Sequence, residues 1–436
     1  MKNTFHTLCF GLLFSVSSTS VQALDFLQSY KLAVNNDPDI LAAQYDYQAS
    51  LETRSQSRSA LLPQINLDVF ANKSNQDSNA ITAIGNSDAT GYSVSLNQSI
   101  YSHDLYKKLE QTDLQIASAT ASFSAQQQAL ILRVAEAYFD VLASEDTLAF
   151  AKAEKNAIGQ QLEQTRQRFE VGLIAITDVK ESQAQYDLSV ASEIQAENVL
   201  LTSRETLRTI IGQYPDELSK LARQFPLVVP EPANIDRWVE TSKENNLAFK
   251  SAQYAYQIAQ TQVLIDRSGH YPTLNLNLSH DDSSTETDTI TYDKKDTSIT
   301  LNLSVPIYSG GLTSARTRQA VAQKERARSL QEQSLRSTIK AARDSYLGVT
   351  ASIAQVHAFK QALISTQTAY EATQAGFEVG TRTAVEVLSV LREQYSAERD
   401  FARSRYDYIL NILRLKQAAG ILSSQDVEQI NQWLKH

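Results

Sequence analysis

The sequence has one cysteine in 436 residues, and Cys9 lies in an N-terminal segment that resembles an export signal. In this segment Lys2 precedes a short apolar run, and small residues lead up to Ala23. This order is typical of a cleavable secretory signal, so we expect residues 1–23 to be a signal peptide. The mature chain would then lack a thiol for a disulfide, a cysteine-based metal site or a lipid anchor.

Several other features are missing. Beyond the signal there is no run of about 18 apolar residues, so we expect no membrane-spanning helix. Lys and Arg number 40 against 49 Asp and Glu, and this acidic balance argues against a nucleic-acid partner. No histidine pair has HExxH spacing, and no nucleophile elbow, phosphate loop or dinucleotide fingerprint is present. We therefore expect a protein that is not an enzyme, with no cofactor and no metal.

Proline and glycine are scarce in two long stretches. Residues 104–168 contain no proline and only Gly159, and residues 313–376 have a similar composition rich in Ala, Gln, Ser, Glu and Arg. At about 1.5 Å per residue, the first stretch predicts a helical rod of roughly 95 Å. Its thin apolar stripe suits helices packed side by side rather than around a globular core.

The sequence is duplicated. The tetrapeptide at Phe169–Gly172 returns at Phe377–Gly380, 208 positions later. Three further matches follow the same order at nearly the same offset: LLPQINLDV with HYPTLNLNL, GYSVSLNQSIYS with SITLNLSVPIYS, and Leu207 and Gly212 with Leu415 and Gly420. Such a series predicts two copies of one unit. We place the repeats at 24–212 and 232–420, each with a helix, a β-hairpin, a long helix, a tip turn and a helix.

Two segments lie outside the repeats. Four of the eight prolines fall in or beside residues 213–231 (Pro215, Pro226, Pro230, Pro232). We expect this segment to be a linker and part of an equatorial region, that is, a region of mixed structure around the middle of the rod. Residues 421–436 form a C-terminal tail, for which both an equatorial position and disorder stay open.

Apolar and polar residues alternate in the expected hairpins. Ile65, Leu67 and Val69 alternate with polar residues, and 92–96, 274–278 and 299–305 repeat the pattern. Period two predicts strands with one apolar face. The pattern fits a sandwich with one wet face, and equally a transmembrane barrel with its apolar face toward lipid.

Tyrosines and loops favour the barrel. Tyrosines stand near the strand ends, as in the aromatic girdles of membrane barrels (Tyr92, Tyr101, Tyr271, Tyr308). The loops between paired strands are expected to be long and polar, and the second, Asp281–Asp296, is acidic. Such loops are typical of an extracellular face.

Gly172 and Gly380 follow the two long helical stretches. Glycine readily takes the left-handed conformation that ends a helix. Each therefore predicts a helix–turn–helix tip, at the end of the rod remote from the strands.

These features together resemble the TolC family of outer-membrane exit ducts. The resemblance covers nearly all of the mature chain and is most specific in FEVGLIAITDV, FEVGTRTAVEVL and the Tyr-Ser-Gly-Gly at 308–311. It implies an α+β membrane protein that forms a homotrimer. Each chain would give four strands to one 12-stranded outer-membrane β-barrel, which a long periplasmic α-helical barrel with a mixed girdle continues.

The resemblance also implies a function. Such a duct passively conducts drugs or secreted polypeptides in a tripartite efflux pump or a type I secretion system. Its partners would be outer-membrane lipid, a periplasmic adaptor (membrane fusion) protein and an inner-membrane translocase of RND, ABC or MFS type. A periplasmic coiled-coil structural or adaptor protein without a pore is the alternative. The sequence does not distinguish drug efflux from protein secretion.

The resemblance assigns a periplasmic gate to residues near the tips. The matching positions are Asp178, Phe377, Arg382 and Glu386, and a contact between Arg382 and Asp178 would be a charge-assisted latch. Some family members have tyrosine in place of Phe377 and a second acid in place of Ser389. In this chain position 389 is serine, so the aperture of a trimer would carry three acidic charges from positions 386 and 389 rather than six. A tightly closed gate is in question to that extent.

Three of the four gate residues also have a structural interpretation. Glu386 follows Thr383 by three positions, as in a capping box that starts a helix. Asp178 falls in a first helical turn, where an acid suits the helix dipole. Phe377 is as well explained by packing.

Overall fold

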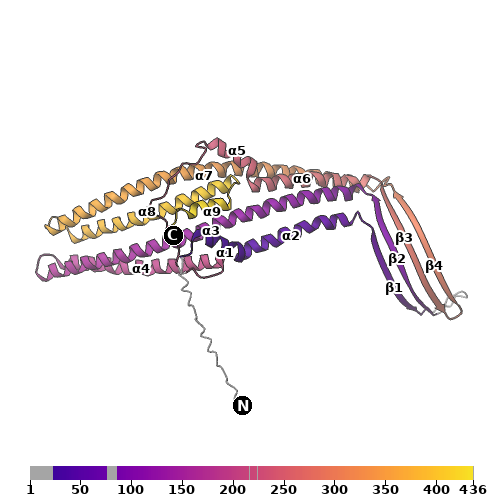
Figure 1. Cartoon of the computed structure of the whole chain (residues 1–436), viewed down its shortest axis with the longest axis horizontal. Helices are drawn as coiled ribbons and strands as arrows, with labels where there is room; N and C mark the ends of the chain where they lie inside the picture. The colour runs from indigo at the N-terminus through magenta and orange to yellow at the C-terminus, as the bar shows by residue number, and fades with distance from the viewer. Residues whose placement is uncertain (1–22, 76–85, 216, 223, 436) are drawn as a thin grey trace, which may run out of the picture.

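The computed structural model describes residues 23–75, 86–215, 217–222 and 224–435. The chain is a long helical rod with a β-sheet at one end and two helical tips at the other (Figure 1). Most of the expected signal peptide, residues 1–22, lies outside the described part. The elements are α1 (Phe26–Asn36), α2 (Pro38–Ser59), β1 (Gln64–Ser74), β2 (Ser87–Tyr101), α3 (His103–Glu170), α4 (Ile176–Ile211), α5 (Ile235–Asn245), α6 (Leu247–Arg267), β3 (Thr273–Thr287), β4 (Thr291–Ser304), α7 (Leu312–Glu378), α8 (Ala384–Ala418) and α9 (Ser424–Asn431), with a short 3-10 helix at Ser268–His270.

The element order repeats. The series α1, α2, β1, β2, α3, α4 is followed by its counterpart α5, α6, β3, β4, α7, α8. The two long helices, α3 and α7, contain 68 and 67 residues, which corresponds to roughly 100 Å each. The structure thus confirms the two long helices that the scarcity of proline and glycine predicts. Among the described residues no helix combines the length and the apolar character needed to cross a bilayer.

The four strands form one antiparallel sheet in the order β1-β2-β3-β4. The two hairpins therefore lie side by side, and the boundary between the repeats runs between β2 and β3. The expected loop Asp281–Asp296 is largely wrong, because β3 and β4 pair as far as Glu286 and Thr291. A short turn remains, in which the Thr287 N–H donates to the Ile290 carbonyl at 2.8 Å. Charged residues can extend these strands because their side chains stay at least partly exposed.

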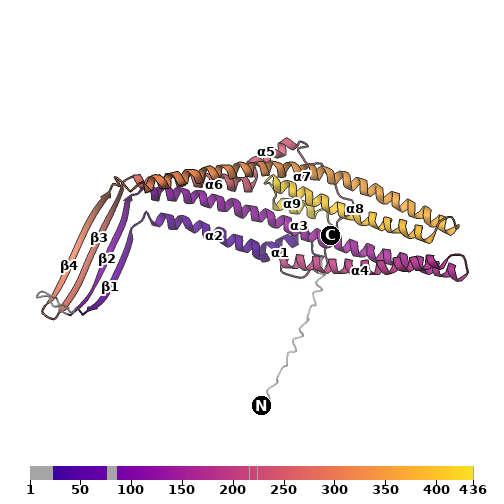
Figure 2. The same ribbon diagram turned by 180° about the vertical axis from the view of Figure 1, so that it is seen from behind.

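The long helices form a layer whose composition changes along the rod. Near the sheet the packed neighbours run in the order α2, α3, α6, α7. Toward the tips the order becomes α4, α3, α8, α7, with α8 also touching α4 (Figure 2). Helices α3 and α7 run through both halves. Within one chain α7 lies at an edge of the layer toward the sheet and toward the tips, and α5 packs against it in the middle of the rod.

The main apolar core lies in the middle of the rod. Phe26, Tyr138, Phe139 and Tyr408 are fully buried there, among aliphatic side chains of α1, α3, α4, α8 and α9. The Tyr138 hydroxyl donates to the Ser219 carbonyl at 2.8 Å. Burial raises the pKa of Tyr138, so the hydroxyl keeps its proton and donates.

The segment between the repeats and the C-terminal tail both join this core. Isolated bridges pair Leu24 with Leu218 and Leu221 with Leu434. In α9, Val427 and Ile430 are buried. The middle of the rod therefore combines helices with short extended segments.

Candidate functional site

The sheet has one apolar face, and most of its side chains are exposed in the single chain. On β1 this face carries Ile65, Leu67 and Val69, the last of them 75 % exposed. The β1–β2 register places Leu67 beside Val94 on the same face. On β4 the face carries Leu301 and its apolar neighbours. We call this row of side chains the apolar band (Ile65, Leu67, Val69, Tyr92, Val94, Leu96, Leu274, Leu276, Leu278, Ile299, Leu301, Leu303).

The opposite face of the sheet is polar. The register aligns Gln64, Asn97, Asn277 and Thr300 across the four strands. One row further, the Ser279 and Ser298 hydroxyls lie 3.0 Å apart. The alternation predicted from the sequence therefore separates an apolar from a polar face. An apolar outer surface and a polar interior are the two surfaces of a membrane barrel.

The apolar band crosses the strands obliquely. Leu301 on β4 pairs with Leu276, which pairs with Gln98 on β2. Continuing the β1–β2 register by one residue places Gln98 opposite position 63 of the first repeat. On β1 the centre of the band is Leu67, four positions away (67 − 63). Four positions correspond to about 13 Å along a strand, and the three spacings from β1 to β4 correspond to about 14 Å across the sheet. The strands thus tilt by roughly 43° from the normal to the band, within the range of closed barrels.

At the tips, two glycines reverse the chain. Gly172 and Gly380 have φ of 74° and 81°, the left-handed conformation that the sequence analysis expects. After Gly172, the Leu173 N–H donates to the Arg168 carbonyl at 2.9 Å. After Gly380, the Thr381 N–H donates to the Gly376 carbonyl at the same distance. These bonds satisfy carbonyls that the helix ends would leave unpaired.

Phe377 is buried at the second tip and carries a contact that sequence reasoning missed. Its ring is 2 % exposed and packs with Ala384 and Val387. The Arg168 guanidinium of the first hairpin lies 4.0 Å from the ring centre. It also donates to the Phe377 carbonyl at 3.0 Å. A cation–π contact and a charge-assisted hydrogen bond thus join the two hairpins at this point.

Arg382, just before α8, contacts Glu386 in the first turn of α8. Arg382 Nη1 donates to Glu386 Oε1 at 2.9 Å. The Thr383 N–H donates to Glu386 Oε2 at 2.8 Å and completes the capping box that the sequence analysis offered as the alternative. The backbone bond from Thr383, with the Arg382 guanidinium, holds the pKa of Glu386 below its usual value.

Asp178 lies in the first turn of α4, as its helix-dipole interpretation expects. In the described part of the chain no hydrogen bond or ion pair joins Asp178 to Arg382. Within one chain Arg382 is instead paired with Glu386. The latch between Asp178 and Arg382 stays a prediction for an assembled ring.

Between the tips and the core, arginine and tyrosine side chains of α8 are linked to acidic side chains of α3. Arg399 Nη1 contacts Glu154 Oε2 at 3.0 Å, and the Tyr406 hydroxyl donates to Asp146 at 2.7 Å. The further links are Arg403 to Asp140 at 2.7 Å and Arg414 to Glu136 at 2.8 Å. We call these four contacts the α3–α8 links.

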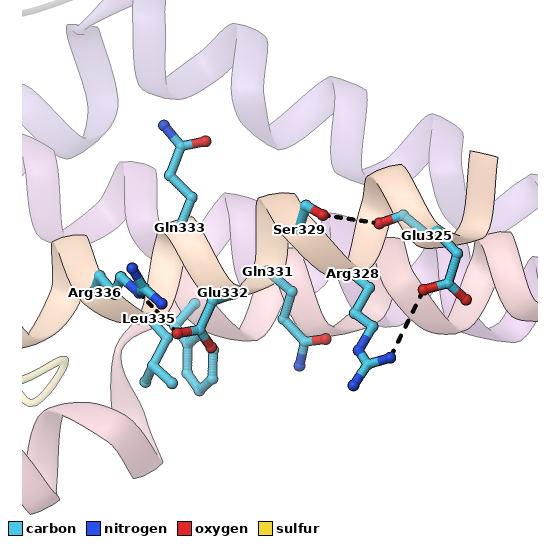
Figure 3. Close-up of a pocket in the computed structure, with 9 residues that line it drawn as sticks. Glu325, Arg328, Ser329, Gln331, Glu332, Gln333, Leu335 and Arg336 are labelled. Atoms are coloured by element: carbon cyan, nitrogen blue, oxygen red, sulfur yellow. Dashed lines mark hydrogen bonds and ion pairs between the residues drawn. The ribbon is translucent and has the colours of Figure 1, made fainter. Parts of the chain in front are cut away.

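The surface of the described part of the chain has several hollows. One hollow of about 770 Å³ runs along α7 beside Phe249. Its charged side chains pair with neighbours on the same helix, for example Glu332 with Arg336 at 2.8 Å (Figure 3). Within the described ranges no three His, Cys, Asp or Glu side chains are placed to hold a metal ion. The features that distinguish this chain are therefore the apolar band, the tips and the α3–α8 links.

Comparison with known proteins gives consistent matches over nearly all of the chain. The profile of a family described as "Outer membrane efflux protein" matches residues 29–213 and 238–421. The chain is 39% identical to the outer membrane protein TolC of Vibrio cholerae over 422 residues, which cover 96% of this chain and 95% of that protein. It is 28% identical to the alkaline protease secretion protein AprF of Pseudomonas aeruginosa, over 97% of this chain and 90% of that protein.

A solved structure has the same fold. The CmeC outer membrane channel of Campylobacter jejuni superposes with a TM-score of 0.79, over 94% of this chain and 90% of that one, at 15% identity.

Proposed function

Because this chain belongs to the outer membrane efflux protein family, we propose that it is the outer-membrane exit duct of a tripartite efflux pump or a type I secretion system. The duct would conduct drugs or secreted polypeptides passively and carry out no catalysis. The observation that carries the proposal is the oblique apolar band at one end of a helical rod of roughly 100 Å. The band gives the chain a lipid-facing surface, and the rod gives it reach into the periplasm.

The sheet supports a homotrimer. Strands β1 and β4 have one partner each, so both edges of the sheet are open. Open edges cannot remain unpaired in a bilayer. The contact between β2 and β3 shows how one repeat pairs with the next, and β4 can pair with β1 of another copy in the same way. Three chains closed in this way give a 12-stranded barrel.

The relatives support both branches of the function. One carries a name that refers to alkaline protease secretion, and another is described as an outer membrane efflux protein of Brucella suis. We propose that the chain docks through its tips to a periplasmic adaptor, which connects it to an inner-membrane translocase of RND, ABC or MFS type. A wide passive duct leaves the choice of cargo to that translocase.

We further propose that Asp178, Phe377, Arg382 and Glu386 surround the periplasmic aperture of the trimer. Phe377 and the left-handed glycines Gly172 and Gly380 hold the turns, while Glu386 contributes one carboxylate per chain near the start of α8. Ser389 supplies no second carboxylate one turn later. Positions 386 and 389 together would then give the aperture of a trimer three carboxylates rather than six.

The alternative is a periplasmic stalk or adaptor without a pore. A stalk needs no lipid-facing surface, so the apolar band argues against it. Adjacent residues on β4 offer a matched test, because Leu301 lies on the apolar face and Thr300 on the polar face.

Leu301→Lys and Thr300→Lys should be expressed in full-length chains, and outer membranes should be washed with carbonate. A lysine at mid-bilayer on the lipid face costs about 2–4 kcal/mol, whereas a lumen position does not carry this penalty. We expect wild type and Thr300→Lys to stay in the membrane and Leu301→Lys to be largely lost from it. Release of the wild-type chain by carbonate would favour the stalk.

A further inference from the structure

One large apolar side chain lies on the polar face of the sheet. Phe70 alternates along β1 with Val69 and Ala71, which belong to the apolar face. It shares its own face with Asp68 and Asn72. Among the described strand residues Phe70 is the one phenylalanine, and it is 44 % exposed in the single chain. In a closed barrel with its apolar face toward lipid, this ring would lie on the inner wall.

The second repeat has a different pair of residues at the equivalent place. Phe70 pairs with Gly91 across the first hairpin. The strand segments match at offsets of 209 (279 − 70) and 207 (298 − 91), so the counterparts are Ser279 and Ser298. These serines pair across the second hairpin, with their hydroxyls 3.0 Å apart. In a barrel of three chains, three Phe–Gly pairs would alternate with three Ser–Ser pairs.

Gly91 leaves one side of Phe70 free of a side chain. A Cβ added at Gly91 would lie 2.6 Å from the Asp282 carbonyl oxygen and 2.8 Å from the Ser283 Cβ. Contacts this short do not occur for real Cβ atoms, so the close approach of β2 and β3 requires glycine here. The position opposite Phe70 is therefore bare backbone.

The other side of Phe70 faces the neighbouring copy in the proposed trimer, where β4 pairs with β1 as β2 pairs with β3. Ser279 pairs with Ser95 between β2 and β3. The counterpart of Ser95 on β4 is Asn302, at the offset of 207 (302 − 95). Asn302 of the neighbouring copy would therefore stand opposite Phe70. A glycine on one side and an asparagine on the other leave the ring open toward the interior.

The barrel is too wide for Phe70 to close it. Twelve strands about 4.8 Å apart and tilted by roughly 43° give a perimeter of about 79 Å and a diameter of about 25 Å. With about eight strands, side chains just fill the interior. Three phenylalanine rings in the wider barrel would line the passage without sealing it, so they would contact what passes through.

The charges on the same face favour cations. Asp68 lies two positions from Phe70 on the same strand. The registers place Asp281 and Asp296 in the same cross-strand row as Asp68. Among the described strand residues, Lys294 is the one basic residue on this face. Each chain thus gives the inner wall three carboxylates near one ammonium group.

We infer that Phe70 contacts cargo and that its three copies weakly bind cationic aromatic molecules inside the barrel. The face of an aromatic ring attracts cations and packs against other rings, and Asp68 supplies an opposite charge nearby. This inference rests on the proposed function, because only a closed barrel places Phe70 in a passage. The contact adds a modest preference to the choice of cargo made by the translocase.

Binding of an aromatic cation to trimers of the full chain in lipid nanodiscs tests the inference. The probe is tetraphenylphosphonium, and tetrabutylammonium has the same charge without rings. Dissociation constants come from saturation-transfer NMR titrations. We expect Phe70→Ser to raise the dissociation constant of tetraphenylphosphonium about two- to fivefold, as loss of an exposed cation–π contact predicts. The dissociation constant of tetrabutylammonium should change less.

Three further variants control the measurement. Val69→Ser changes the adjacent residue on the lipid face and should leave the dissociation constant at the wild-type value. Phe70→Leu keeps an apolar side chain without a ring and should bind the aromatic probe as weakly as Phe70→Ser. Ser279→Phe adds a ring at the equivalent place of the second hairpin and should strengthen binding.

Equal affinity of wild type and Phe70→Ser for tetraphenylphosphonium would overturn the inference, even if the variant lowered thermal stability, because Phe70 would then only support the hairpin. An equal loss in Val69→Ser would also overturn it, since the probe would be binding from the lipid side. If Phe70→Ser does not assemble, wild-type affinity in both Phe70→Leu and Ser279→Phe overturns the inference. Wild-type trimers that form no channels in planar bilayers would instead count against the proposed function.

Discussion

The middle of the rod and its tips are held together by different kinds of contact. Helices α3 and α8 both extend from the middle of the rod toward the tips. In the middle, fully buried Phe26, Tyr138 and Phe139 pack against each other with ring centres 5.5–5.7 Å apart. Near the tips the buried apolar clusters are small, and one consists of Phe377, Ala384 and Val387 with Tyr370 against it. The rest of the tip contacts are polar and mostly exposed.

This difference separates a fixed from an adjustable region. Burial of large side chains contributes a few kcal/mol each, whereas exposed ion pairs contribute about 0–1 kcal/mol. Regions with few buried contacts open at lower free energy than the core of the same protein. A duct needs a rigid middle to hold its shape and weakly held tips that a partner can move.

The largest expected effect comes from the middle. Phe139→Ala should lower the free energy of unfolding by about 3–5 kcal/mol, because it removes a fully buried ring and leaves a cavity. Both tryptophans of the chain, Trp238 and Trp433, lie in or against this core, so their fluorescence during denaturant unfolding measures the change. The control Phe169→Ala removes the same side chain at an exposed tip position and should change this transition little.

Phe377→Ala should have a smaller and local effect. The substitution removes the ring under Arg168 and opens the small tip cluster, with an expected local loss of about 1–3 kcal/mol. Hydrogen exchange followed by mass spectrometry should show faster exchange at 370–390, while tryptophan-monitored unfolding stays near wild type. A shift of the tryptophan transition as large as that of Phe139→Ala would show that middle and tips unfold as one unit.

Gly380→Ala tests the tip turn alone. At φ 81° a Cβ meets no atom within 4 Å, so only the left-handed backbone is strained, at about 1–2 kcal/mol. Asparagine tolerates this conformation better, so Gly380→Asn should fall between wild type and alanine. Hydrogen-exchange rates of the tip amides should rank wild type, Gly380→Asn and Gly380→Ala by the stability of the tip turn. Equal rates for alanine and asparagine would show that backbone strain does not control the turn.

The smallest expected effect is pH dependence at Glu386. Its pKa is lowered in the folded protein, so its contribution to tip stability is complete above the unfolded carboxyl pKa and is lost as pH falls through the folded value. Tip exchange rates, corrected for intrinsic pH dependence, should therefore rise only in this acidic range. In Glu386→Gln this rise should be absent, and an unchanged rise would assign the effect to another group.

Much of the architecture is predictable from the sequence. The repeat offset, the scarcity of proline and glycine and the period-two alternation led to two units, two rods and four strands. These patterns are local or periodic, and each reflects one physical requirement along the chain. The helix-ending glycines belong to the same class, because their conformation depends on a few neighbouring residues.

The contacts between distant segments were not predictable in this way. Arg168 and Phe377 are 209 positions apart, and the packing of both α3 and α7 against α8 brings them together. The α3–α8 links join charges that, on either helix alone, look like a solvated face. The acidic ends of β3 and β4 resemble a loop in the sequence, because polar composition alone does not reveal strand pairing. A comparison of the repeats contained one usable signal, since arginine precedes FEVG in the first copy and glycine in the second.

Single-channel conductance in planar bilayers tests most directly whether the chain forms a duct narrowed at its tips. Purified wild-type trimers should be compared with Asp178→Ala combined with Arg382→Ala. We expect small, uniform conductance steps for wild type and clearly larger steps for the double variant, because polar contacts at the aperture would be removed. Well-folded trimers that insert into the bilayer and conduct no ions in either form would contradict the account.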